Sequence, residues 1–207
     1  MLDTDFFRRW MTAAAASVER EANHLTELDS AIGDADHGSN LQRGFAAVTE
    51  VLEKDAPATP GAVLTLAGRQ LISTVGGASG PLYGTLLRRT GKALGDDGEV
   101  TPAQFAQAFA AGVAAVGQLG GAQAGDKTML DALLPAAEAL ATSFDGAAEA
   151  ARAGAVATVP MRARKGRASY LGDRSIGHQD PGATSAALLV ETLAATATAT
   201  ATDGVDG

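Results

Sequence analysis

Cysteine is absent from the 207-residue chain, so neither a disulfide nor a thiolate nucleophile or metal ligand is available. Aromatic residues make up only 4% of the sequence, whereas hydrophobic residues make up 46%. Alanine, leucine and valine must therefore form most of the core, which favours closely packed helices. Strand-like alternation of apolar and polar residues is also lacking. These absences together predict an all-α protein.

Positive charge is scarce as well. The chain has 16 lysine and arginine residues against 24 aspartate and glutamate residues, which gives a formal net charge of −8. We therefore expect neither nucleic acid nor an anionic membrane surface as a partner. No apolar stretch approaches the ~18 residues of a membrane span, and residues 1–5 do not resemble the start of a secretion signal. A cytoplasmic location is expected.

Apolar residues recur at helical spacing in eight segments. Three of them cover about residues 3–29, 40–54 and 146–159, and the others open at Pro60, near Ser79, at Thr101-Pro102, after Asp126 and at Asp180-Pro181. Mostly short links are typical of antiparallel neighbours, so we expect one helical domain over residues 1–194. Residues 195–207 are a threonine- and alanine-rich tail that is expected to fray.

Three carboxylates lie close together in the segment LDSAIGDADHGSN. At 100° per residue, Asp29 and Asp36 would fall about 20° apart on one helix, while Asp34 would lie about 140° from Asp29. An unbroken helix therefore cannot bring all three together. Gly33 and Gly38 supply breaks that allow a loop to turn the side chains inward.

The first helix should therefore end near residues 29–30, and the next should begin near residues 39–40. Clustered carboxylates repel one another unless a cation neutralises them, and oxygen ligands without sulfur suit Mg²⁺. Two Mg²⁺ ions beside three carboxylates leave about one positive charge, which a bound polyphosphate would meet. A solvated, aspartate-rich turn is the alternative.

One connection, residues 160–179, is about 20 residues long and has little apolar periodicity, and such loops are usually functional. It holds five of the 16 basic residues: Arg162, Arg164, Lys165, Arg167 and Arg174. We expect this segment to form a cationic lid whose arginines reach phosphate oxygens. A solvated basic loop and a nucleic-acid patch are the alternatives, although a single tyrosine is thin evidence for base stacking.

Glycine-rich corners precede several helices. The corner GGASG at residues 76–80 suits an anion, because the first amides of a helix are free there. The segment GGAQAGDKT resembles a Walker A loop, but Asp126 separates the glycine from Lys127 and no strand precedes it, so we reject a P-loop. Asp180-Pro181-Gly182 forms a third corner, for which a simple helix cap is the alternative.

Four motifs occur in order across most of the chain: LDSAIGDADHG, GGASGPLYG, GDKTMLDAL and GRASYLGDRSIGHQDPGATS. As a set they resemble the nucleotide-binding L subunit of dihydroxyacetone kinase. The resemblance implies a barrel of eight antiparallel amphipathic helices, with a nucleotide and two Mg²⁺ ions held by the loops at one end.

The resemblance also assigns residues, with Asp29, Asp34 and Asp36 as the Mg²⁺ ligands. The residues implied on the phosphate side are His37, Gly38, Ser39, Asn40, Ala78 and Ser79. Those implied at the adenine end are Gly120 and Met129, with Asp180, Pro181 and Gly182 completing the pocket. Arg167 is the expected catalytic residue, stabilising phosphate charge from the lid, and no general base is expected in this chain.

The implied cofactors are ADP or ATP and two Mg²⁺ ions. The implied partners are a K subunit, which holds dihydroxyacetone covalently through a histidine, and a phosphohistidine protein of the phosphoenolpyruvate phosphotransferase system, which recharges the ADP. A separate L chain fits this branch of the family. Exchange of ATP from solution, another short ketose as acceptor, and docking on a transcription regulator are the alternatives.

Overall fold

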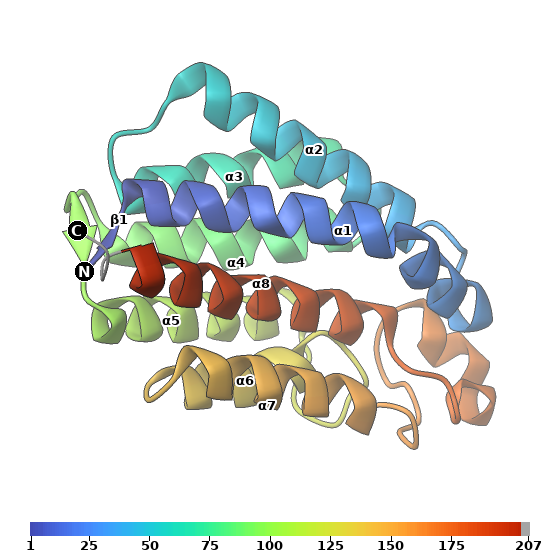
Figure 1. Ribbon diagram of the computed structural model, residues 1–207. Coiled ribbons are helices and arrows are strands. Elements are labelled where there is room, and N and C mark those ends of the chain that lie inside the picture. Colours follow the sequence, from blue (N-terminus) through green and yellow to red (C-terminus); the bar gives the residue numbers. More distant parts are fainter. Residues whose placement is uncertain (204–207) are drawn as a thin grey trace.

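The computed structural model describes residues 1–203, with side chains as far as residue 200 (Figure 1). Its helices are α1 (Thr4–Ile32), α2 (His37–Asp55), α3 (Pro60–Thr74), α4 (Ser79–Leu94), α5 (Pro102–Gly120), α6 (Leu130–Leu140), α7 (Phe144–Ala157) and α8 (Pro181–Asp203), with a 3-10 segment, η1 (Arg167–Ser175), before α8. Two short strands, β1 (Leu2–Asp3) and β2 (Glu99–Val100), pair antiparallel and were not predicted. The all-α class is confirmed.

The eight α-helices of the described chain close into a ring. Each helix packs against the next one in sequence, and α8 packs against α1. Because successive helices run in opposite directions, the links α1–α2, α3–α4, α5–α6 and α7–α8 all gather at one end (Figure 1). Met1 and β1 lie at the other end. The expected antiparallel barrel is therefore confirmed, and four separate parts of the sequence meet at one place.

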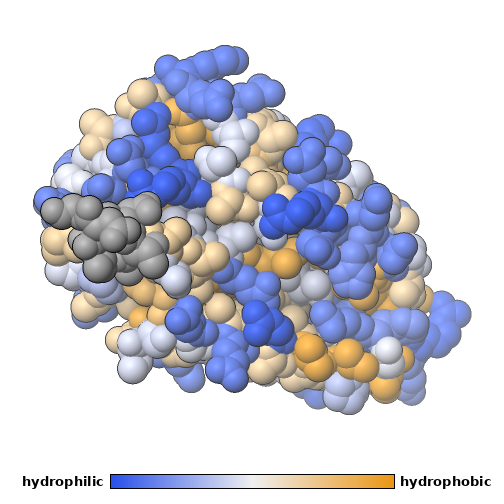
Figure 2. All heavy atoms as spheres, in the orientation of Figure 1, coloured by the Kyte–Doolittle hydropathy of each residue, from blue (hydrophilic) through white to orange (hydrophobic). Residues whose placement is uncertain are grey.

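Most of the few aromatic residues cluster in the core between α1 and α5. The ring of Phe7 meets that of Phe105 edge-on at a centroid distance of 5.2 Å, and Trp10 meets Phe105 at 5.8 Å. Trp10 is fully buried, and its indole Nε1 donates to the carbonyl of Leu189 at 3.0 Å, which ties α1 to α8. Leucine, valine and alanine form most of the remaining core. Figure 2 accordingly shows a mainly hydrophilic face with separate, small hydrophobic patches.

Helix starts follow the capping signals of the sequence. The starts predicted at Pro60, Ser79 and Pro102 are confirmed, the last with a complete capping box. Helix α7 begins two residues earlier than predicted, because the Ser143 hydroxyl accepts the N–H of Gly146 and caps the helix.

Helix α8 does not stop at residue 194. It continues to Asp203, so the tail that was expected to fray is helical that far, and residues 204–207 lie outside the described chain. Alanine favours helix, and the hydroxyls of Thr196, Thr198 and Thr200 each donate to the carbonyl four residues earlier. Thr196 is also buried against the bundle.

Within residues 1–203, no helix combines the length and apolar character needed to cross a membrane.

Candidate functional site

A cavity of about 440 Å³ opens where the four links meet, and we call it the loop-end cavity. All four links contribute to its wall, together with the helix ends beside them. Its polar lining includes Asp29, Asp34, Asp36, His37, Asn40, Ser79, Lys127, Thr128, Lys165, Arg167 and Asp180. The predicted site residues therefore come together from positions more than 150 residues apart in sequence, with two exceptions described below.

The three predicted carboxylates converge on one wall of this cavity. Asp29 lies in the last turn of α1, and Asp34 and Asp36 lie in the following loop, where Ala35 takes a left-handed conformation with φ of 61°. Each side chain offers an oxygen within 4.8 Å of the other two. The inward loop is confirmed, although α1 ends at Ile32 rather than near residues 29–30.

Asp29 also explains why α2 begins at His37 rather than near residues 39–40. Its Oδ2 accepts the backbone N–H groups of Asp36, at 2.9 Å, and His37, at 3.2 Å. The side chain of Asp36, the residue before α2, makes no capping hydrogen bond of its own. A carboxylate from the preceding helix therefore takes the place of a local cap and couples the acidic cluster to the start of α2.

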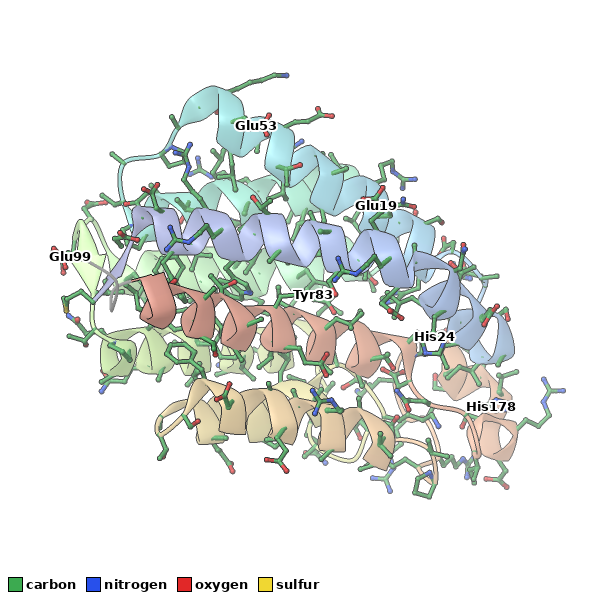
Figure 3. The ribbon with its side chains drawn as sticks, viewed as in Figure 1. Glu19, His24, Glu53, Tyr83, Glu99 and His178 are labelled. Atoms are coloured by element: carbon green, nitrogen blue, oxygen red, sulfur yellow. The ribbon has the colours of Figure 1, made fainter. Side chains whose placement is uncertain are left out.

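His37 is buried between two serines. Its Nδ1 lies 3.2 Å from the Ser79 hydroxyl and its Nε2 lies 2.8 Å from the Ser185 hydroxyl, which in turn lies 2.6 Å from the Tyr83 hydroxyl. Burial lowers the pKa of His37, even though neighbouring carboxylates raise it, so the ring is neutral near pH 7. Figure 3 shows Tyr83 deep between the helices, and its burial raises the pKa of its phenol. This polar chain links α2, α4 and α8.

Two predicted phosphate-side residues do not line the cavity. Gly38 faces α1, where a Cβ would run into the backbone carbonyl of Ala22, so this glycine allows α1 and α2 to pack closely. The Ser39 hydroxyl donates to the carbonyl of Asp36 at 3.0 Å. Both residues lie in the first turn of α2, where Gly38 permits close helix packing and the Ser39 side chain stabilises the helix start, and neither lines the cavity wall.

The lid is folded against the bundle rather than being a solvated loop. The Arg167 guanidinium reaches Asp34 Oδ2 at 2.9 Å, so the lid touches the acidic cluster directly. Below it, Ala163, Ala168 and the partly buried Leu171 pack on Ile32 at the end of α1. Figure 3 shows His178 at the same end of the molecule as this segment.

The other basic side chains of the lid are differently placed. Arg162 pairs with Asp173 at 3.3 Å, within the lid itself. Arg174 is exposed and does not line the cavity in this structure. Arg167 and Lys165 are thus the two lid cations on the cavity wall of the described chain.

Asp180 opens α8 beside the lid. Its Oδ2 accepts the N–H of Ala183 at 2.7 Å, and its own N–H donates to the Thr158 hydroxyl at 2.9 Å. Burial raises the pKa of this carboxyl to about 7, although the Ala183 N–H and Lys127 lower it. Asp180 therefore changes protonation near neutral pH.

Apolar side chains complete the wall of the loop-end cavity. They are Ile32, Leu82, Val116, Leu119, Ala122, Met129 and Leu130, with Gly120 among them. A Cβ added at Gly120 would lie 3.6 Å from the Leu82 side chain. A cavity with one polar, acidic wall and one apolar wall suits a ligand with a charged group and a flat heterocycle.

The sequence analysis did not predict the structural roles of four residues. Tyr83 and Lys127 line the cavity, and Asp131 and Ser185 lie next to residues that do. All four fall inside the motifs quoted above, which was the available signal. Asp131 shapes the α5–α6 link by accepting the N–H groups of Gly125, at 2.6 Å, and Thr128, at 2.8 Å. The rejection of a P-loop is confirmed, because helix α5 precedes this link and Lys127 is bonded to backbone carbonyls.

The acidic cluster fits a hard divalent cation on the evidence of its donors. Three carboxylates supply oxygen alone, within the spacing that a shared ion needs. Asp34 already pairs with a cationic group, the guanidinium of Arg167. The site is thus built for positive charge.

Comparison with known proteins identifies the family. The sequence model of the DAK2 domain family matches residues 31–195, and the chain belongs to this family. It is 44% identical over 195 residues to the ADP-binding subunit DhaL of the PEP-dependent dihydroxyacetone kinase of Escherichia coli K12, covering 89% of this chain and 93% of that protein. It is 39% identical over 204 residues to the corresponding subunit of kinase 2 of Listeria innocua, covering 93% and 94%.

A solved structure gives the same fold. The dihydroxyacetone kinase of C. freundii, in complex with AMP-PNP and Mg²⁺, superposes with a TM-score of 0.73 at 26% sequence identity. The match covers 93% of this chain and 34% of that longer one. The helical barrel therefore occurs both as a separate chain and as about a third of a larger kinase.

Proposed function

We propose that this protein is the nucleotide-carrying subunit of a dihydroxyacetone kinase. It transfers a phosphoryl group from a bound magnesium nucleotide to dihydroxyacetone held on a separate K subunit. The observation that carries the proposal is the convergence of Asp29, Asp34 and Asp36 at a cavity with an apolar far wall. Near full-length similarity to ADP-binding subunits supports it.

The nucleotide is proposed to lie across the loop-end cavity. Its phosphates would lie beside the starts of α2 and α4, where helix N-termini favour anions. The adenine would lie against Gly120 and Met129. Asp29, Asp34 and Asp36 would hold two Mg²⁺ ions, which when bound neutralise phosphate charge. The remaining proposed contacts are His37, Gly38, Ser39, Asn40, Ala78, Ser79, Asp180, Pro181 and Gly182, with the backbone acting for Gly38 and Ser39.

The chain itself contributes position and charge. Arg167 lies against Asp34 and is proposed to stabilise the negative charge of the transferred group. Both ring nitrogens of His37 are already bonded to serine hydroxyls, which argues against a role as general base. Phosphoryl transfer needs in-line geometry more than covalent work by the protein, and the rigid ring of helices supplies it.

The phosphoryl donor is proposed to be a phosphohistidine protein of the phosphotransferase system, acting on ADP that stays bound. The separate E. coli subunit of matching length belongs to a PEP-dependent kinase, which supports this branch. All these partners would meet the protein in the cytoplasm. A docking role on a transcription regulator is the alternative, and it does not require phosphoryl transfer.

The first test is denaturing release of nucleotide from freshly purified protein, with mass spectrometric identification and a parallel count of Mg²⁺. We expect about one ADP and two Mg²⁺ per chain, and loss of both in Asp34→Asn. Asp97→Asn, in the exposed link at the opposite end, is the matched control. An empty site together with many turnovers on added ATP would instead indicate the ATP-exchanging branch.

The second arm supplies the K subunit, dihydroxyacetone and a phosphohistidine donor. Formation of dihydroxyacetone phosphate by wild type but not by Asp34→Asn is expected. Tight ADP binding without any transfer in this complete mixture would contradict the kinase role and leave the docking role.

A further inference from the structure

Lys127 is an unusual residue of the α5–α6 link. Its backbone takes a left-handed conformation, with φ of 62°, which a non-glycine residue adopts only when the surroundings hold it there. Its side chain is only 1% exposed. None of the ion pairs in the described chain includes it. A buried ammonium without an ion-pair partner needs another source of stabilisation.

Four backbone carbonyls supply that stabilisation. The Lys127 ammonium donates to the carbonyls of Thr158 at 2.9 Å, Met161 at 3.1 Å, Ser175 at 2.8 Å and His178 at 2.5 Å. An ammonium has three N–H groups, so these four acceptors use all of them. No proton is left for a phosphate oxygen. The geometry therefore distinguishes Lys127 from the phosphate-binding lysine of a P-loop.

The four carbonyls belong to the two ends of one segment. Thr158, the C-cap of α7, and Met161 lie where the chain enters the lid, and Ser175 and His178 lie where it leaves the lid. The Lys127 side chain therefore joins the two ends of the lid. Three further hydrogen bonds donated by backbone N–H groups lie alongside: Arg164 N–H to Asp126 O at 3.1 Å, Gly177 N–H to Val159 O at 2.8 Å, and Ala163 N–H to the Ser175 hydroxyl at 2.9 Å.

We propose that Lys127 is a positioning residue, whose ammonium holds the two ends of residues 158–178 together and thereby places Arg167 against the acidic cluster. The functional part of this inference rests on the role proposed above for Arg167. A long loop closed at its base has far fewer conformations than an open one, so the arginine at its centre reaches Asp34 without a large ordering penalty on ligand binding.

Replacing Lys127 by methionine keeps much of the side-chain volume but removes every donor. The carbonyls of Thr158 and Ser175, both on buried residues, would then lose a partner, and an unsatisfied buried acceptor is unfavourable. The two ends of the lid should separate to reach water. Lys92→Met is the matched control, because Lys92 is exposed in the last turn of α4.

The first experiment is hydrogen exchange on the ligand-free protein. In wild type, the amides of Ala163, Arg164, Gly177 and Asp180 should exchange slowly. In Lys127→Met they should exchange at least 10-fold faster, while the amides of α2–α4 keep their wild-type rates and Lys92→Met changes neither set. Fast exchange of these four amides in wild type, or unchanged exchange in the variant, would overturn the proposal. This arm needs no nucleotide, so it stands even if the proposed function fails.

The second experiment is a double-mutant cycle with Arg167→Ala, read out as MgADP affinity by calorimetry. We expect each single variant to weaken binding about 10-fold and the double variant to be no more than about 2-fold weaker than the weaker single variant, because Lys127 acts through Arg167. Fully additive losses would overturn this link. If Lys127→Met does not fold, Lys127→Arg serves instead, since a planar guanidinium cannot converge on the same four carbonyls.

Discussion

Asp180 is both a helix cap and a buried acid. As a cap it is favoured in the ionised form, because the N–H of Ala183 donates to it. Burial opposes ionisation more strongly and raises the pKa of the carboxyl to about 7 from an ordinary value of 3.8. In the folded protein the proton is therefore held more tightly than in the unfolded chain. The contribution of this proton to stability is complete below pH 4 and is lost as the pH rises through 7.

A pH series on metal-free protein should reveal this. Between pH 5 and pH 8 the free energy of unfolding of wild type should fall by about 2–3 kcal/mol relative to Asp180→Asn, since each pKa unit is worth about 1.4 kcal/mol. Asparagine keeps an acceptor for Ala183 but does not titrate. Urea unfolding in a chelator at both pH values gives the comparison. A difference between the two proteins that stays constant with pH would show that Asp180 has an ordinary pKa.

Whether a site residue could be predicted depends on how far apart in the sequence it and its contacts lie. The acidic cluster could be predicted because Asp29, Asp34 and Asp36 lie within eight residues and the glycines beside them dictate a loop. The structural part of Lys127 could not, since His178, one of its acceptors, lies 51 residues away. Burial of His37 against Ser185, 148 residues apart, likewise depends on the closed ring.

Among the helices, α3 and α4 approach each other unusually closely. A Cβ on Gly68 would lie 2.6 Å from the carbonyl oxygen of Gly84, and a Cβ on Gly84 would lie 2.6 Å from that of Gly68. Backbone atoms cannot move aside as a flexible side chain can. This helix pair therefore depends on two reciprocal glycines, which fix the distance between the elements flanking the α3–α4 corner of the cavity.

Gly68→Ala should lower the free energy of unfolding by about 2 kcal/mol, because overpacking outweighs the gain of about 1 kcal/mol in helix propensity. Thermal or denaturant unfolding measures the change. The matched control is Gly146→Ala in the first turn of α7, where the nearest atom to the new Cβ is 3.4 Å away, so that variant should be neutral or slightly more stable. Equal stability of Gly68→Ala and wild type would mean that α3 and α4 can move apart to accommodate the added methyl group at no cost in stability.

Element boundaries were predictable where their signals are local. Apolar periodicity and capping residues located most helix starts. The end of α1 and the start of α2 were misplaced because the cap of α2 is the side chain of Asp29 in another helix. The extension of α8 to Asp203 was not predicted, because a threonine- and alanine-rich sequence carries no strong apolar pattern.

At the scale of the molecule, the two ends of the ring have different tasks. The end that carries the α1–α2, α3–α4, α5–α6 and α7–α8 links forms the cavity, and the other end carries β1, β2 and the remaining links (Figure 1). The same change in chain length should therefore affect ligand binding strongly at the cavity end and little at the other end.

Six glycine and serine residues inserted after Asp97 should change MgADP affinity less than 2-fold, because Asp97 is exposed in a link far from the cavity. The same insertion after Gly166, in the lid, should weaken binding more than 10-fold, because it displaces Arg167. Calorimetric titration of both variants tests this, with circular dichroism to establish that each is folded. Similar MgADP affinities in the two variants would show that nucleotide binding does not depend on the position of the lid.

The placement of Met1 opposite the cavity bears on how such a subunit can evolve. A second domain joined there would begin at the end opposite the cavity, so a linker would have to carry it to the cavity mouth (Figure 1). The match to about a third of the C. freundii kinase is an instance of this barrel inside a longer chain. Tethering the acceptor-bearing domain would leave the chemistry as it is and raise the local concentration of the partner, so encounter frequency becomes a property of the linker.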